Sequence, residues 1–291
     1  PFGRDPLRVL KTLPQLTAED LHQFLRQFIV GGKLVAAVAG DIDRAQVEEG
    51  LDRLLGRLPK TGAAERRLPD PERTAPFIGL VHKPGQVQAQ IAIMLPGIPR
   101  SHPDFWKLNL TASIFGGGDS LLYTRLRDDL GLAYSAGLYQ TYLWRAGVLK
   151  GMIGCRSDKT RLALSETIKL MREMGRRVPQ ERFVLKRLDA LNSFVFNVDT
   201  PAKLMEVYAR YFLRGEPLDT LDRIQEQFMT AERKAVQTLA SRYLKPENLQ
   251  IVVVADKTTV VADGEDRLSL AEDLKRLAAE MGIPFREIAL R

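Results

Sequence analysis

Residues 115–135 hold the side chains of this sequence whose types and spacing could do chemistry. The segment runs Phe-Gly-Gly-Gly-Asp-Ser-Leu-Leu-Tyr-Thr-Arg-Leu-Arg-Asp-Asp-Leu-Gly-Leu-Ala-Tyr-Ser. A helix predicted over residues 120–130 places Arg127 near Tyr134, which opens the next predicted strand. An arginine fork and a phenol at such a corner could bind a peptide carbonyl, or the oxyanion that forms when the carbonyl is attacked. A surface arginine beside a half-buried strand tyrosine is the competing interpretation.

An apolar stripe predicts which way this helix faces. Leu122, Leu126 and Leu130 are spaced four residues apart, so they should form one buried face. Arg127 is one step of about 100° from Leu126, which places it at the edge of that stripe. Gly131 is predicted to end the helix.

The residues before this helix form a supporting loop. Gly116, Gly117 and Gly118 should end the preceding helix, and Asp119 or Ser120 should cap the following one. A glycine-rich turn before a helix could cradle an anion. Asp119 opposes a phosphate there and no lysine follows, so a tight turn between two helices is the favoured interpretation.

The sequence predicts no metal site. A zinc site needs three or four clustered ligands, and His22, His82 and His102 are far apart along the chain. Neither His-Glu-x-x-His nor its inverted form His-x-x-Glu-His occurs. Glu19 and His22 have the spacing of half a two-metal helix motif, but an exposed surface pair is favoured. The single Cys155 excludes an internal disulfide and is predicted to be a buried, inert thiol.

Composition narrows the function classes. The chain has 291 residues, of which 45% are hydrophobic and 27% charged, which excludes wholesale disorder, collagen and coiled coil. No charge-free apolar stretch approaches the roughly 18–20 residues that span a bilayer. The net charge of +7 could suit nucleic acid, a membrane surface or acidic substrates. Nucleic-acid binding is disfavoured because positive charges alternate with negative ones, and because Trp106 and Trp144 lie in predicted packed elements.

The elements that position these residues predict an α+β fold with an antiparallel-rich sheet covered by helices. Strands are expected at 34–39, 77–82, 87–95, 133–143, 148–155, 249–255 and 284–290. Helices are expected at 17–30, 45–58, 103–115, 120–130, 158–174, 179–196, 201–213, 230–244 and 268–281. Four prolines and seven charges among residues 59–76 indicate a linker.

One pattern occurs twice. Residues 16–41 and residues 229–256 each contain Thr-Ala-Glu, a predicted helix, and an apolar strand that ends at aspartate. Thr17 maps to Thr230 and Asp41 to Asp256, which favours duplication over chance. Residues 77–291 would then form one complete module, and residues 1–59 the tail of a preceding module whose head is missing from the chain.

The segment around 115–135 resembles the C-terminal half of the M16 metallopeptidases, which include pitrilysin, insulysin and the mitochondrial processing peptidase. The motif Gly-Gly-Gly-x-Ser-x-Leu-x-x-x-Leu-Arg-x-x-Leu-Gly-Leu-Ala-Tyr-Ser carries most of the resemblance. Residues 1–4, Leu-Thr-Ala-Glu-Asp-Leu at 16–21, and Ala-Gly-Asp at 39–41 are similar to the end of that family's N-terminal module. The resemblance covers nearly the whole chain and implies paired homologous α+β modules.

The resemblance also implies a division of labour. The family's zinc ligands, an inverted His-x-x-Glu-His motif and a distant glutamate, belong to the N-terminal module, and nothing here matches them. Arg127 and Tyr134 match the family's arginine and tyrosine positions, which help to hold the peptide and stabilise the intermediate. Gly116, Gly117, Gly118 and Ser120 support them. The chain alone is therefore expected to bind no catalytic zinc and to have no peptidase activity.

We therefore expect residues 1–59 to be the remainder of a first M16 module, 60–76 a linker, and 77–291 a complete non-zinc module. The expected function is the substrate-holding half of a zinc metalloendopeptidase, with a peptide substrate and a zinc-bearing M16 half as partners. That half would be either upstream in the same polypeptide or a separate subunit. A non-catalytic assembly subunit is the alternative. No nucleic acid and no membrane span are expected, and a periplasmic location is favoured because bacterial relatives are often exported.

Overall fold

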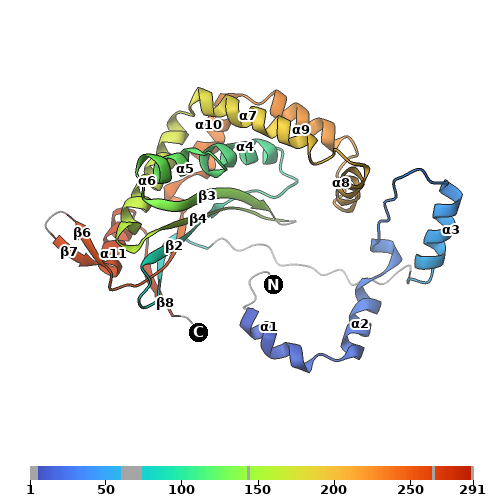
Figure 1. The fold of residues 1–291 in the computed structure, drawn as a ribbon, viewed down its shortest axis with the longest axis horizontal. Coiled ribbons are helices and arrows are strands. Elements are labelled where there is room, and N and C mark those ends of the chain that lie inside the picture. The colour runs from blue at the N-terminus through green and yellow to red at the C-terminus, as the bar shows by residue number, and fades with distance from the viewer. Residues whose placement is uncertain (1–5, 60–73, 143–144, 264–265, 290–291) are drawn as a thin grey trace. The chain divides into compact units, whose positions relative to one another are not determined.

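The structure is a computed structural model that describes residues 6–59, 74–142, 145–263 and 266–289 (Figure 1). The chain divides into two compact units. The sheet unit comprises the described residues of 70–194 and 221–291, and the helical unit those of 1–69 and 195–220. None of the described helices combines the length and the apolar character needed to cross a membrane.

Six strands of the sheet unit form one mixed sheet in the order β3-β4-β2-β5-β1-β8. They are β1 (Phe77–His82), β2 (Gln88–Pro96), β3 (Ala133–Tyr142), β4 (Gly147–Arg156), β5 (Gln250–Ala255) and β8 (Phe285–Ile288). Neighbours from β3 to β5 run antiparallel, while β5, β1 and β8 run parallel. The predicted α+β class is confirmed. A separate hairpin of β6 (Val260–Asp263) and β7 (Asp266–Ser269) was not predicted.

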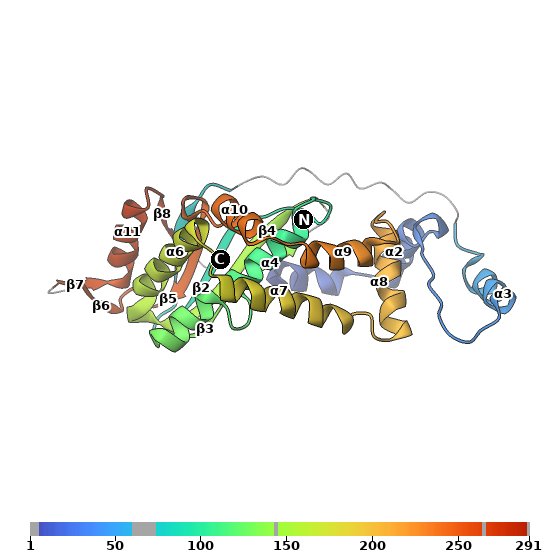
Figure 2. The ribbon, with the colours of Figure 1, turned by 90° about the horizontal axis from the view of Figure 1, so that it is seen from above.

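The helices of this unit lie mainly over one face of the sheet (Figures 1 and 2). They are α4 (Phe105–Gly116), α5 (Leu121–Tyr123), α6 (Thr160–Arg176), α7 (Gln180–Val195), α9 (Thr220–Met229), α10 (Arg233–Tyr243) and α11 (Leu270–Glu280). Shorter turns are η3 (Thr124–Asp129, a π-helix), η4 (Ser157–Lys159) and η5 (Pro246–Asn248). Helix α9 was not predicted.

The core lies between this helical layer and the sheet. Ile91 and Ile93 of β2 and Leu138 of β3 are fully buried, whereas Gln88 and Gln90 on the other face are exposed. This alternation is the period of two expected of a strand with one buried face. Cys155 is buried as predicted, and burial raises the pKa of its thiol to about 11, so the thiol stays neutral and inert.

The second face of the sheet is called the open face here, because its side chains point away from the helices that cover the core. It consists of the odd-numbered residues of β1 and of β3 from Ser135 onward, and of the even-numbered residues of β2, β4, β5 and β8. Met152 and Tyr139 on this face are 45% and 59% exposed.

The helical unit contains α1 (Pro6–Thr12), η1 (Leu13–Gln15), α2 (Ala18–Phe28), η2 (Gly31–Lys33), α3 (Arg44–Leu55) and α8 (Pro201–Leu213). Thr17 caps α2 as predicted, in a reciprocal capping box with Asp20. The Thr17 backbone N–H donates to the Asp20 carboxylate at 2.8 Å, and the hydroxyl of Thr17 accepts from the Asp20 N–H at 3.2 Å. Hydrogen bonds from Thr17 also lower the pKa of Asp20.

The strand predicted over residues 34–39 does not form. The backbone at Leu34 is extended, with φ −106° and ψ 135°, yet the segment joins no ladder among the described residues. An extended segment becomes a strand only when a neighbouring strand pairs with its backbone N–H and C=O groups. The apolar run was therefore not sufficient to predict a strand here. Of the predicted linker over 60–76, residues 60–73 lie outside the described residues.

The repeat is reproduced unevenly. In the second copy, α10 begins after Glu232 rather than at Thr230. The Thr230 hydroxyl instead donates to the carbonyl oxygen of Glu226 at 2.8 Å, at the end of the unpredicted α9. The shared Thr-Ala-Glu letters therefore start a helix in the first copy and follow one in the second.

Candidate functional site

Tyr134 is presented by a β-bulge at the start of β3. Ala133 pairs with Cys155 and Ser135 with Gly154, so Tyr134 is the extra residue between two ladder positions. A bulge re-aims the side chain at that point, and such bulges are frequent beside active sites. Ala133 and Ala136 are buried on either side, whereas Tyr134 is 80% exposed. The bulge therefore delivers a large aromatic side chain to the surface at the end of an edge strand.

Arg127 is presented by the π-helical turn η3 rather than by a regular α-helix. Leu122 and Leu126 are fully buried as predicted, but Leu130 is 37% exposed, so the predicted three-leucine stripe is wrong at its last member. The wider π-turn moves the later position off the buried face. Gly131 ends the turn in the left-handed region at φ 59°, as predicted. Single π-turns inside helices are often found at functional sites.

The arginine lies against two tyrosine rings. Its guanidinium carbon is 5.0 Å from the ring centre of Tyr123 and 5.7 Å from that of Tyr134. One guanidinium N–H donates to the hydroxyl oxygen of Tyr123. Cation–π contacts at these distances orient a guanidinium without neutralising it. Arg127 and Tyr134 are thus brought together as predicted, and Tyr123 is a third member that the sequence analysis missed.

The glycine loop, residues 116–120, packs tightly at one end and is open at the other. A Cβ on Gly116 would lie 2.4 Å from the backbone nitrogen of Leu138, so only glycine allows this helix end to approach β3. Around Gly118 there is open space. Ser120 is fully buried, and its hydroxyl accepts a hydrogen bond from the Tyr123 N–H at 3.1 Å, which confirms it as the N-cap.

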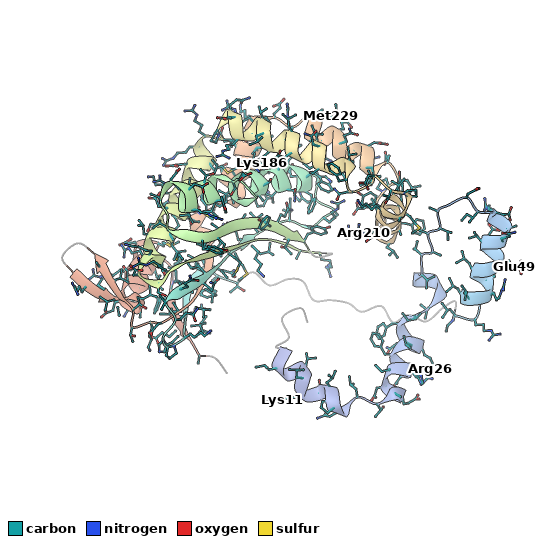
Figure 3. The ribbon with its side chains drawn as sticks, viewed as in Figure 1. Lys11, Arg26, Glu49, Lys186, Arg210 and Met229 are labelled. Carbon is teal, nitrogen blue, oxygen red and sulfur yellow. The ribbon has the colours of Figure 1, made fainter. Side chains whose placement is uncertain are left out.

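Two basic residues of α7 donate hydrogen bonds to backbone carbonyl oxygens of this loop. Lys186, labelled in Figure 3, has a side chain that is only 8% exposed. Its ammonium donates to the carbonyl oxygen of Gly118 and lies 3.4 Å from the Asp189 carboxylate. Arg182 donates to the carbonyl oxygen of Asp119 at 2.7 Å. Asp119 itself adopts the left-handed region at φ 49°, which is costly for a residue with a Cβ. The α7 cations therefore stabilise a strained turn that starts the Arg127 helix.

A pocket of about 560 Å³ joins these parts. Its lining comprises Gly117, Gly118, Tyr123, Arg127, Tyr134, Ser135, Ala136, Gly137, Tyr139, Thr141, Lys150 and Met152. The sequence analysis missed Tyr139, Lys150 and Met152. Hairpin register could have found them, because pairing across the turn near residue 145 places Lys150 opposite Tyr139.

The described residues do not fit a zinc site. No group of three or more His, Cys, Asp or Glu side chains in that part of the chain is placed to hold a metal. Each histidine has one acidic neighbour: Glu19 is 3.9 Å from His22, Asp256 is 3.8 Å from His82, and Asp104 is 4.0 Å from His102. Since zinc sites use at least three protein ligands, none of these pairs can hold the ion as a catalytic centre.

The arrangement can bind a polar group that accepts hydrogen bonds. A guanidinium has five N–H donors, and the Arg127 contact to Tyr123 uses one of them. The phenol of Tyr134 is exposed beside it and can donate one more. Two donors that converge on a pocket suit a carbonyl oxygen or an oxyanion. The geometry supplies binding and charge stabilisation, and neither residue is arranged as a nucleophile or a base.

Comparisons with known proteins agree on one family. Residues 15–188 match the family described as "Peptidase M16 inactive domain". An uncharacterized zinc protease of Rickettsia felis is 29% identical over 189 residues, which cover 63% of this chain and 44% of that protein. The beta subunit of the mitochondrial-processing peptidase of Saccharomyces cerevisiae is 28% identical over 142 residues, 47% of this chain and 30% of that subunit. The chain thus spans less than half the length of both relatives.

Solved structures show the same fold. A peptidase M16 inactive domain from Pseudomonas fluorescens matches with a TM-score of 0.75 at 21% identity, covering 87% of this chain and 61% of that one. A chain of complex III from Candida albicans matches with a TM-score of 0.69 at 13% identity, covering 96% of this chain and 64% of that one. At these identities the likeness shows the fold alone.

Proposed function

Because the chain belongs to the M16 peptidase family, as an inactive-type domain of zinc proteases, we propose that it is the substrate-holding half of a zinc metalloendopeptidase. The observation that carries the proposal is the convergence of Arg127 and Tyr134 on one pocket at the end of the edge strand β3. A peptide carbonyl in that pocket would accept hydrogen bonds from the guanidinium and the phenol. The same donors would stabilise the negative charge that develops on this oxygen when the carbonyl is attacked.

The catalytic groups must come from elsewhere. The described residues hold no zinc site, and the pocket lining contains no histidine, cysteine or carboxylate that could activate a water or a hydroxyl, so hydrolysis would require a zinc-bearing M16 half. The contribution of this chain is to bind the peptide, to orient one carbonyl and to offset charge. Periplasmic placement is part of the proposal, supported by the fold likeness to the periplasmic protease PqqL of Escherichia coli, with a TM-score of 0.59.

Exposure of the pair favours this role over that of an assembly subunit. Tyr134 is 80% exposed and Arg127 pairs with no carboxylate among the described residues, so neither residue is needed to hold the sheet unit together. An assembly subunit gains nothing from an uncompensated cation and an exposed phenol in a pocket. The alternative therefore has a clear consequence: both residues could be replaced without loss of function.

Titration of the pure chain with a fluorescently labelled extended peptide tests the proposal. We expect Arg127→Ala and Tyr134→Phe to weaken binding by about three- to tenfold, because each removes one hydrogen bond to the peptide. Arg172→Ala is the matched control, since Arg172 is exposed on α6 and away from the pocket lining. Equal binding by all four proteins would favour the assembly role.

A further inference from the structure

We propose that Lys150 selects peptides that carry an acidic side chain, four or five residues along the chain from the carbonyl held by Arg127 and Tyr134. This inference rests on the proposed function, since it assigns a substrate class to the same pocket. It concerns a residue that the sequence analysis did not single out.

The first observation is the charge of the open face. Its charged members are Lys150, Arg156 and Arg286, all of them cations. No Asp or Glu side chain points from these six strands to this face in the described part of the chain, although the chain has 36 acidic residues. The acid on β8, Glu287, points to the other side and lines a pocket with α11. The open face therefore attracts negative charge and repels positive charge.

The second observation separates Lys150 from the other cations. Arg156 is neutralised by a two-bond pair with Asp158, at 3.0 and 2.9 Å. Arg286 lies at the far side of the sheet, with its guanidinium carbon 4.9 Å from the ring centre of Phe77. Lys150 has no carboxylate partner among the described residues and lines the pocket beside Tyr139. Of the three cations on the open face, Lys150 is the one that lines the pocket and that a bound peptide would meet.

Strand geometry sets the distance between the two binding points. Lys150 lies opposite Tyr139, and Tyr139 is five residues beyond Tyr134 on β3. At about 3.4 Å per residue, five residues span roughly 17 Å, and the bulge at Tyr134 shortens this span. An extended peptide that runs along β3 rises by the same amount per residue. The side chain that reaches Lys150 is therefore four or five residues from the held carbonyl.

The surface between the two points suits uncharged side chains. Gly137 lies between Tyr134 and Tyr139, and a Cβ there would lie 3.0 Å from the Tyr139 ring, so the aromatic ring lies over the glycine. Met152 is opposite Gly137 and is 45% exposed. This stretch offers apolar contact and no charge. Apart from Arg127, which is engaged with the held carbonyl, Lys150 is the charged side chain of the pocket lining, so we place the charge selection at its end of the pocket.

The test uses pairs of labelled eight-residue peptides that differ in one residue, Glu or Gln, placed at each position in turn. We expect the wild-type chain to bind the Glu peptide about threefold more tightly at positions four or five residues from the held carbonyl, as for one exposed ion pair. The preference should shrink as salt is raised, because exposed charges are screened. It should disappear in Lys150→Gln and persist in Lys150→Arg.

Charge reversal separates selection from folding. Lys150→Glu should prefer a Lys peptide to the Glu peptide, and a merely structural role for Lys150 would not reverse the order. Lys169→Gln, at an exposed position of α6, is the control that should keep the wild-type preference. Equal binding of Glu and Gln peptides by the wild-type chain, or a preference that survives in Lys150→Gln, would overturn the inference and leave the proposed function standing. Binding of no peptide at all would overturn both.

Discussion

Two regions of the chain share one local pattern, a helix followed by an apolar segment that ends at aspartate. The two copies of this pattern differ in how the helix packs and in whether the apolar segment forms a strand. In residues 229–256 the helix α10 packs against α4 and α6, and the segment becomes β5 between β2 and β1. In residues 16–41 the helix α2 has no buried residue, and segment 34–39 joins no ladder among the described residues.

The difference separates what is local from what depends on neighbours. Helix α2 forms because its capping box and its hydrogen bonds lie within the segment itself. A strand and a buried helix face both need a neighbouring element to pair with or pack against. The sheet unit supplies such neighbours for α10 and β5. Phe24 and Leu25 of α2 are 56% and 50% exposed, whereas Leu239 of α10 is 5% exposed. The same pattern is core in one region and surface in the other.

The largest expected effect is a leucine truncation made in both regions. Leu239→Ala should cost about 2–3 kcal/mol, because it removes buried methyl groups and leaves a cavity under α10. Leu25→Ala should change stability by less than about 0.5 kcal/mol, because the side chain is half exposed. Urea unfolding followed by circular dichroism measures both. Equal losses would mean that α2 is packed as tightly as α10.

A glycine pair should give effects of opposite sign. Gly116→Ala should cost about 1–3 kcal/mol, since its Cβ would overlap the backbone of Leu138. Gly50→Ala in α3 should stabilise by about 0.5–1 kcal/mol, because nothing lies within 4 Å of its Cβ and alanine favours a helix. The same unfolding experiment compares them. A stabilising Gly116→Ala would show that the glycine loop is looser than described.

A lysine pair sharpens the comparison further. Lys186 and Lys203 each hydrogen-bond one carbonyl oxygen and one carboxylate, but their side chains are 8% and 48% exposed. Lys186→Met should cost about 1–2 kcal/mol and weaken peptide binding, because the glycine loop loses its support. Lys203→Met should cost less than about 0.5 kcal/mol. If Lys186→Met left both stability and peptide binding unchanged, α7 would have no part in positioning the site.

The smallest expected effect concerns the aspartates that end the two copies of the repeated pattern, Asp256 and Asp41, and it is an effect on acid stability. Hydrogen bonds from the Thr258 hydroxyl and from the Gly85 and Thr258 backbones lower the pKa of Asp256 to about 2 from 3.8. The stability that this carboxylate contributes is present above pH 3.8 and is lost as pH falls through about 2. Asp256→Asn should therefore flatten the acid-unfolding curve between these values. Asp41, whose carboxylate makes no hydrogen bond in the described part, is the control, and an equal effect of Asp41→Asn would contradict this cause.

Sequence patterns predicted those features whose causes lie within a few residues. The alternation in β2 and the helix end at Gly131 were predicted, and the cap was narrowed to Asp119 or Ser120, of which the structure has Ser120. Each of these features depends on local periodicity or on one backbone angle. The strand at 34–39 was wrong because strand formation depends on a neighbour.

The candidate site was predictable in part. The Arg127 and Tyr134 positions followed from a helix-to-strand junction, but the π-turn and the β-bulge that aim them leave no simple periodicity. Tyr123 is four residues before Arg127, and this helical spacing could have identified it. Lys186 could not be found from sequence, because its contact with Gly118 joins residues 68 positions apart.

The most direct test of the account measures zinc content and peptide cleavage of the pure chain, alone and after mixing with an M16 half that carries the His-x-x-Glu-His motif. We predict that the pure chain alone contains no stoichiometric zinc and cleaves no peptide. We predict cleavage after mixing, and a loss of about 100-fold in Arg127→Ala, which is typical of removing one donor to a developing oxyanion. Cleavage by the pure chain that EDTA abolishes, or a mixed activity that Arg127→Ala and Tyr134→Phe leave unchanged, would contradict these predictions.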